Sequence, residues 1–303
     1  MKRGFLHIAI FLSVFLLSFH CEGKKKDAAM PFLETKVNRY NTVEGEKVIY
    51  EVILNSAEAS VAGVEVVSLP EFSGLDAGHI APDSRLEEVE ADGRRYYRAV
   101  VDRFFIGTDT KGKYVVKGGT YRIGINRQFA VTDPFWGPSL ATRTEMFVLD
   151  APDVRIQVAP VPLKGMPAGF SGAVGRFDIE MTLVNKEVRA GEDACLSVVI
   201  SGNGDLSKSK LPEIHKSFGD GLHFKSMTDS MEHYIKNGSL GSEMEIECLF
   251  SPEKSGKYTI APIDFSYFDS ATGKYVTVST PPLEIDVIDA VRVSEDPPVI
   301  MDV

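Results

Sequence analysis

The stretch from Val154 to Phe177 constrains the fold most, because it closes one β unit and opens another. Its first five residues alternate between apolar and polar side chains, which predicts a half-buried strand over 154–158. Three prolines follow, at Pro160, Pro162 and Pro167. Proline lacks a backbone N–H and has a fixed φ, so strand pairing is expected to stop there. We interpret 159–168 as a semi-rigid Pro-rich linker.

A glycine-rich stretch and a second alternating run follow this linker. Gly169, Gly172 and Gly175 are expected to form turns and to allow close backbone approach. A half-buried strand is predicted from Phe177 onward. Further β-rich runs cover Val48–Leu54, Val61–Leu69 and Tyr96–Ile106. No sustained period of 3.6 residues occurs, so the pattern indicates an all-β protein.

An internal repeat divides the chain in two. A Gly-Glu pair precedes a strand at Gly45 and again at Gly191, and the run Val154–Val158 parallels Leu283–Val287 as a closing strand. The repeat predicts two tandem immunoglobulin-like β-sandwiches, over 31–158 and 169–290. The tail, 291–303, is expected to be loosely ordered.

A Gly-x-Tyr pattern entering a late strand is a third element of the repeat. Gly119-Thr120-Tyr121 parallels Gly256-Lys257-Tyr258. Such a tyrosine is typical of a tyrosine corner, in which the hydroxyl binds the backbone of the preceding turn. We therefore predict that Tyr121 and Tyr258 form these corners.

The N-terminus carries an export signal. Two basic residues precede an apolar run from Phe5 to Phe19, which is typical of a secretory signal peptide and short for a membrane span. Cys21 is a candidate lipidation site, and cleavage after Gly23 is the alternative. We expect residues 1–23 to be a signal peptide, 24–30 to be a flexible segment, and the protein to reach the periplasm or cell envelope.

The net charge argues against a nucleic-acid partner, and the strand pattern argues against a disulfide. The net charge is −10, and the basic cluster Lys24–Lys26 is the only one apparent, so we expect no nucleic-acid partner. Alternation places Cys195 on an outer strand face and Cys248 on an inner one. We therefore predict no disulfide between them, although an exported protein could form one.

Five segments carry a resemblance to a known family: Val161–Leu163, Pro167–Phe177, Ile200–Leu206, Leu211-Pro212 and Gly256–Asp269. They resemble motifs of the BatD family, the exported member of the Bat aerotolerance operons. The resemblance implies an exported accessory protein that works beside von Willebrand A-domain proteins and a MoxR-type ATPase. Family members are usually longer and end in a membrane span. This chain has no second apolar stretch of that length, so attachment is expected only through its N-terminus.

Catalytic and metal-binding patterns are weak. The spacing of His215, His223 and His233 matches no metal-ligand motif, and with His79 they are interpreted as surface or loop histidines. The glycines after the linker precede a strand and not a helix, so they do not predict a phosphate-binding loop. Ser201–Asp205 is interpreted as a β turn or bulge. We predict a protein that is not an enzyme and has no metal or other cofactor.

Binding is therefore the favoured role, and aromatic residues at predicted loop tips are the candidate anchors. These are Phe135 and Trp136, and Tyr267 and Phe268. The alternative is that they cover or fill their own sandwich. We interpret the chain as a BatD-like interaction protein of the envelope. A carbohydrate-binding module with an aromatic strip and a purely structural spacer are the alternatives.

Overall fold

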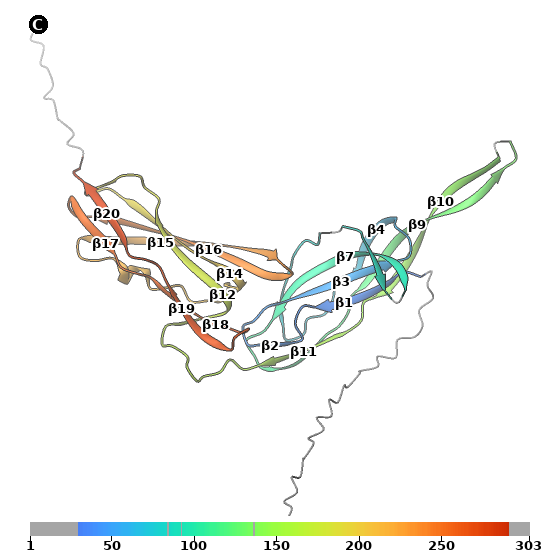
Figure 1. Cartoon of the computed structure of the whole chain (residues 1–303), viewed down its shortest axis with the longest axis horizontal. Helices are drawn as coiled ribbons and strands as arrows, with labels where there is room; N and C mark the ends of the chain where they lie inside the picture. The colour runs from blue at the N-terminus through green and yellow to red at the C-terminus, as the bar shows by residue number, and fades with distance from the viewer. Residues whose placement is uncertain (1–29, 84, 92, 136, 291–303) are drawn as a thin grey trace, which may run out of the picture.

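The computed structural model describes residues 30–83, 85–91, 93–135 and 137–290, and in these residues the chain is almost entirely β (Figure 1). The predicted all-β class is confirmed. The predicted signal peptide, Cys21, Trp136 and the tail lie outside the described residues.

Within the residues that the structure describes, eleven strands form the first sandwich. They are β1 (Phe32–Val37), β2 (Asn41–Val43), β3 (Val48–Ser56), β4 (Val61–Ser68), β5 (Asp76–His79), β6 (Glu87–Ala91), β7 (Arg94–Gly107), β8 (Gly112–Val116), β9 (Thr120–Asp133), β10 (Gly137–Asp150) and β11 (Val154–Ala159). One sheet has the order β1-β3-β7-β5, with β6 also paired to β7, and the others are β10-β9-β4 and β2-β11-β8. The three β runs predicted here from the sequence are β3, β4 and the greater part of β7.

The remaining strands form the second sandwich. They are β12 (Phe170–Leu183), β13 (Val188–Arg189), β14 (Ala194–Asp205), β15 (Leu222–Lys236), β16 (Ser239–Pro252), β17 (Gly256–Ile260), β18 (Asp264–Asp269), β19 (Lys274–Ser279) and β20 (Leu283–Ile288), with a short 3₁₀ helix, η1 (Ile214–Ser217), before β15. The sheets have the orders β15-β16-β14-β12-β18-β19 and β13-β20-β17.

Each sandwich has its own apolar core, which the alternation along its strands produces. In β11 the residues Val154, Ile156 and Val158 are buried and those between them are exposed. The first core also contains Tyr50 and Tyr121, and the second is centred on Phe177, Phe250 and Phe265. Burying one such side chain stabilises a fold by about 1.5–3 kcal/mol. These two separate cores agree with two sandwiches, while the domain limits 31–158 and 169–290 stay a prediction.

The Gly-Glu repeat has a structural basis. Gly45 and Gly191 both adopt a positive φ, 81° and 77°, which glycine adopts without a steric cost. The N–H of Gly45 donates to the carbonyl of Thr108 at 2.9 Å, and that of Gly191 to the carbonyl of Pro252 at 2.8 Å. The equivalent turns therefore start β3 and β14 in the same way, as the sequence predicted.

The tyrosine prediction is correct for the second sandwich and wrong for the first. The Tyr258 hydroxyl donates to the Lys254 carbonyl at 3.0 Å, and its counterpart is Tyr114, which donates to the Thr110 carbonyl at 2.8 Å. Each tyrosine lies in a Gly-x-Tyr strand, β8 or β17, that pairs with the closing strand β11 or β20. Tyr121 instead donates to the Asp102 carboxylate at 2.9 Å in the buried core.

The predicted turn is present at Gly169 and the predicted close backbone approach at Gly175, but Gly172 and Gly175 lie within a strand and not in turns. β12 begins at Phe170, seven residues before the predicted strand start, and runs through Gly172 and Gly175. Gly175 lies opposite Gly204 of β14, and a Cβ at Gly175 would lie 2.0 Å from the Asn203 carbonyl oxygen. The segment predicted as a turn or bulge, 201–205, is thus the end of β14.

The sequence predicted that Cys195 lies on an outer strand face and Cys248 on an inner one. Cys248 is buried in the second core, whereas Cys195 is partly exposed and points away from that core. The register places Cys195 opposite Leu249, and Leu196 opposite Cys248. The two thiols are free in the structure, and burial raises the pKa of Cys248 to about 11.

Candidate functional site

A long hairpin projects from the first sandwich (Figure 1). Its strands β9 and β10 are 14 residues each and pair continuously from Thr120↔Asp150 to Asp133↔Gly137. Near the body, Tyr121, Ile123 and Ile125 of β9 are buried in the first core. Beyond Asn126 the apolar residues have no opposing sheet, so this half of the hairpin stands in solvent.

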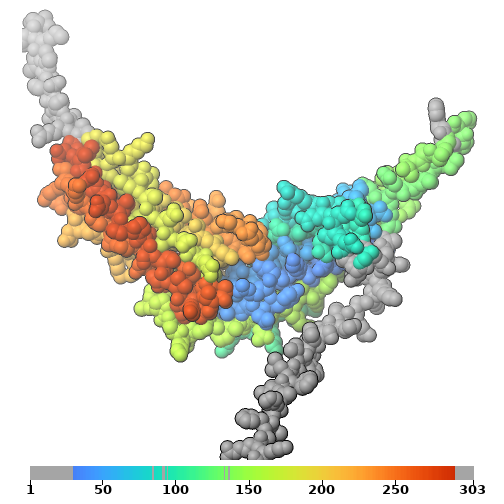
Figure 2. Space-filling model, viewed as in Figure 1, coloured from blue at the N-terminus to red at the C-terminus, as the bar shows by residue number. Residues whose placement is uncertain are grey.

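Exposed apolar side chains concentrate on the sheet β10-β9-β4. They are Val64, Val66, Val67 and Leu69 in or just after β4, Phe129 and Val131 in β9, and Leu140, Met146 and Val148 in β10. Figure 2 shows the hairpin in green, extending from the body. Clusters of exposed apolar side chains on this scale are typical of protein interaction sites. We name these nine residues and Phe135 the arm surface; the register places Leu140, Met146 and Val148 on one face of the hairpin and Phe129 and Val131 on the other.

Phe135 lies at the hairpin tip and its side chain is 91% exposed. The sequence predicted an aromatic anchor in this loop, and the structure places Phe135 where a partner could reach it. Whether it binds one stays a prediction. Its neighbour Trp136 lies outside the described residues.

Tyr267 and Phe268 are not surface anchors, and that prediction is wrong. They are 4% and 2% exposed and lie inside β18, before the β18–β19 turn. Tyr267 points into the second core, where its ring centroid is 5.5 Å from that of Phe177. Phe268 points to the other face and packs edge-on against Tyr275 at 5.1 Å.

Ion pairs stiffen the arm. Arg127 is 3.1 Å from Glu145 across the hairpin, and Arg143 also binds Glu145. The Arg143 hydrogen bond, assisted by Arg127, lowers the pKa of Glu145. Arg127 also lies over the Phe147 ring, 5.6 Å from its centroid. The face opposite Leu140, Met146 and Val148 is therefore charged at mid-hairpin.

Two buried carboxylates bind histidines, one in each sandwich. Asp102 lies 3.0 Å from the Nε2 atom of His79 in β5, and Asp205 lies 2.9 Å from that of His233 in β15. Both histidines lie in strands and not in loops. His79 is exposed, which agrees with the interpretation as a surface or loop histidine, whereas the His233 side chain is mostly covered. Sequence spacing gave no sign of either pair, since each one forms only through strand pairing.

The Asp205 cluster contains a serine but is not arranged as a nucleophilic triad. The Ser207 hydroxyl donates to Asp205 at 2.8 Å, so the carboxylate and not the imidazole accepts its proton. A serine nucleophile needs its hydroxyl on the histidine. Among the described residues, no three histidine, cysteine or carboxylate side chains gather as a metal-binding group.

The two sandwiches contact each other beside this cluster. The His233 ring stacks on Phe105 of β7, with centroids 5.1 Å apart and planes 27° apart. Lys208 binds Asp76 and Asp109, the latter at 2.8 Å. These contacts join β15 and the segment after β14 to β5, β7 and the β7–β8 turn of the first sandwich.

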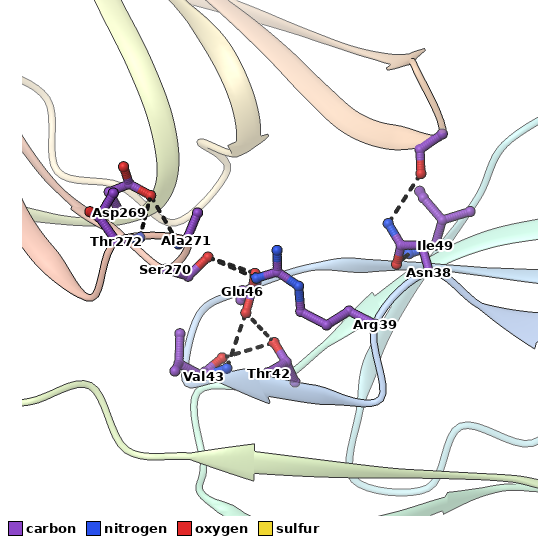
Figure 3. A network of polar contacts seen from close by, with 11 residues as sticks. Asn38, Arg39, Thr42, Val43, Glu46, Ile49, Asp269, Ser270, Ala271 and Thr272 are labelled. Atoms are coloured by element: carbon purple, nitrogen blue, oxygen red, sulfur yellow. Dashed lines mark hydrogen bonds and ion pairs between the residues drawn. The ribbon is translucent and has the colours of Figure 1, made fainter.

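A second polar contact lies near the linker (Figure 3). The Ser270 hydroxyl donates to Glu46 at 2.8 Å, and Arg39 donates to both Glu46 and Ser270. The Asn38 side chain donates to the Gly238 carbonyl at 3.1 Å. Between β11 and β12, the Pro162 carbonyl accepts a hydrogen bond of 2.7 Å from the Tyr275 hydroxyl.

Three of the five motif segments that carry the BatD resemblance meet at one groove, whereas Val161–Leu163 and Ile200–Leu206 do not line it. A groove of about 780 Å³ in the second sandwich is lined by 167–171, 261–266 and Leu211-Pro212, together with Lys210 and Lys216. The Ser171 hydroxyl joins two of these segments by donating to the Ser266 carbonyl at 2.7 Å. These three segments therefore build one local structure.

The described residues form an all-β protein of two β-sandwiches with an exposed arm. Residues 181–287 match the family model described as the BatD DUF11-like domain, so the predicted resemblance to the BatD family is confirmed for this part of the chain. No curated protein matches the chain. Within the described residues, no helix is long and apolar enough to cross a membrane.

Two solved structures are similar to the chain at low identity. The type II cohesin dyad from the adaptor ScaA scaffoldin of Acetivibrio cellulolyticus covers 84% of this chain and 98% of its own, at 11% identity and a TM-score of 0.22. The D0-D1 domain of Intimin covers 85% of this chain and 100% of its own, at 9% identity and a TM-score of 0.15.

Proposed function

We propose that the chain is an exported, non-catalytic, BatD-like interaction protein of the cell envelope, and that its arm surface docks a von Willebrand A-domain protein. The BatD-like second sandwich supports the envelope context. The observation that carries the proposal is the run of exposed apolar residues on β4, β9 and β10, together with Phe135 at the tip.

The chemistry of the arm surface favours a protein partner over a carbohydrate. Sugar-binding surfaces stack sugar rings on aromatic side chains, whereas the described arm surface is mostly aliphatic and includes only Phe129 and Phe135 as aromatics. A spacer needs no such surface. Valine, leucine and methionine beside an aromatic tip fit a protein interface core, which is apolar and rimmed by charge.

The test is a crosslinking pull-down from native envelope, with the mature protein tagged at its C-terminus. We expect von Willebrand A-domain proteins to be recovered with the wild type and to be reduced at least about tenfold with Phe135→Ser. The matched control is Leu163→Ser between β11 and β12, since Leu163 is 83% exposed and lies outside the arm surface. Equal recovery with both variants would exclude the arm tip, and recovery of glycan alone would support the carbohydrate-binding alternative.

A further inference from the structure

The outer edge of the arm is paired with no described strand, although β1 of the sandwich body lies close to part of β10. Among the described strands β10 pairs only with β9, in the order β10-β9-β4, and it is 14 residues long. An edge strand presents unpaired N–H and C=O groups that can pair with a further strand. Proteins usually block long edges with prolines, bulges or covering segments, and β10 has its only proline at Pro138, next to the tip.

Two hydrogen bonds fix which residues of β10 face this edge. The Asn126 N–H donates to the Ser60 carbonyl at 2.9 Å, on the β4 side. In an antiparallel ladder, residues directly opposite each other turn their backbone groups either toward one another or both away. Thr144, which is paired with Asn126, therefore turns its N–H and C=O away from β9. The Ala151 N–H donates to the Gly119 carbonyl at 2.8 Å, which agrees with this assignment because it shows an odd-numbered residue that faces the β9 side.

The residues whose backbone faces the open edge are thus the even-numbered ones: Leu140, Thr142, Thr144, Met146 and Val148. A second antiparallel strand can bond here only if its own outward-facing residues lie opposite these. For a second copy of β10, this condition means that the two-fold axis must lie at a residue of the strand and not between two residues.

We propose that two copies of this chain pair β10 with β10 about a two-fold axis at Thr144. Arg143 then lies opposite Glu145 of the second copy, and the same pair forms twice by symmetry. An axis at Arg143 or at Glu145 would instead place like charges directly opposite each other, which destabilises a strand pair. An axis at Thr142 would place Arg143 opposite Ala141 and form no ion pair.

The apolar face matches in the same register. Leu140 lies opposite Val148 of the second copy, again twice, and these side chains are 70% and 62% exposed in the single chain. On the charged face, Ala141 lies opposite Phe147. Charge complementarity and apolar complementarity thus select one alignment, which joins two three-stranded sheets into a six-stranded one.

The proposal goes beyond the proposed function, and its first test is sedimentation velocity of the mature chain over a concentration series. We expect a monomer–dimer equilibrium that Thr144→Pro weakens at least about tenfold, because proline removes the N–H at the axis. The fold should persist, since that N–H does not bond to β9. Thr144→Val is the matched control: it loses the same hydroxyl bond to Asn126 but keeps the N–H.

Charge reversal tests the register. Arg143→Glu alone and Glu145→Arg alone should each lose the dimer, whereas a mixture of the two variants should regain it, because every position is then opposite an unlike charge. A second readout is oxidation of Thr144→Cys, whose Cα atoms would lie about 5.5 Å apart, within disulfide range. Leu140→Cys is its control, because its two copies would lie about 27 Å apart.

A chain that stays monomeric at every concentration, a Thr144→Pro dimer as strong as that of Thr144→Val, or self-crosslinking at Leu140→Cys would each overturn the proposal. A monomer that still recovers von Willebrand A-domain proteins would overturn the dimer and leave the proposed function intact. A dimer that recovers no von Willebrand A-domain protein would contradict the proposed function and leave the dimer proposal intact.

Discussion

The protonation of Asp205 is linked to folding. Its carboxylate is buried at the end of β14 and accepts from the Ser207 N–H at 2.9 Å. Burial alone would raise the pKa of Asp205, but the hydrogen bonds from His233 and Ser207 outweigh it and hold the pKa below the ordinary value of 3.8. The unfolded chain therefore takes up this proton at a higher pH than the folded one.

A group whose pKa is lowered by folding stabilises the fold at pH values above its pKa in the unfolded chain. That contribution is lost as the pH falls through its pKa in the folded chain. We expect the wild type to be more stable than Asp205→Asn at about pH 6, and the difference to shrink below about pH 4. Urea unfolding of both proteins across this range measures it. A difference that stays constant with pH would mean that the substitution removes only packing, not a linked proton.

Aromatic residues show what a sequence can and cannot place. Phe135 and Tyr267-Phe268 both precede turn signals, and the sequence treats them alike. They differ because β9 and β10 extend past the core, whereas β18 is paired on both sides, by β12 and β19. Strand length relative to the opposing sheet decides exposure, and it is set by contacts between residues distant in the sequence.

At the scale of elements, the β12–β14 pair depends on glycines that face each other. A Cβ at Gly175 would lie 2.0 Å from the Asn203 carbonyl oxygen, and its φ of 149° is itself unfavourable for other residues. Gly175→Ala should therefore cost about 3 kcal/mol or more in unfolding free energy. Denaturant unfolding checks this.

Two glycines of the same strand region serve as graded controls. Gly172 has a φ of 89° and open space where an alanine methyl group would lie, so Gly172→Ala should cost only about 1 kcal/mol. Gly169 has open space and no positive φ, so Gly169→Ala should be within about 0.5 kcal/mol of the wild type. Equal losses at all three positions would contradict the close strand approach at Gly175.

The repeat shows which parts of an element can be predicted. Gly45 and Gly191 were paired correctly, because a turn that needs a positive φ leaves a local residue signature. The Gly-x-Tyr match chose Tyr121 over Tyr114, because both fit the local pattern and only the pairing of β8 with β11 distinguishes them. The hairpin arms were missed, although Tyr121, Ile123 and Ile125 alternate on one side of the tip and Phe147 and Leu149 on the other.

At the scale of the whole molecule, the two sandwiches are held together by few, mostly polar contacts. Lys208 binds Asp76 and Asp109 of the first sandwich, and these carboxylates raise its pKa, so it stays charged. Each such exposed ion pair stabilises by no more than about 1 kcal/mol. The arrangement therefore depends on several weak contacts acting together.

Reversing the charge of Lys208 should favour separation of the two sandwiches. Lys208→Glu places three carboxylates together, and we expect it to lower the ratio of docked to separated sandwiches roughly 5–30-fold, which corresponds to about 1–2 kcal/mol. Small-angle X-ray scattering at low salt should show a larger maximum dimension than in the wild type, and high salt should reduce the difference because it screens exposed charges. The control is Lys210→Glu: the described residues offer the exposed Lys210 side chain no ion-pair partner. If Lys208→Glu and Lys210→Glu scatter alike, Lys208 does not hold the sandwiches together, and the Phe105–His233 stack and the contacts around Glu46 and Ser270 must do so.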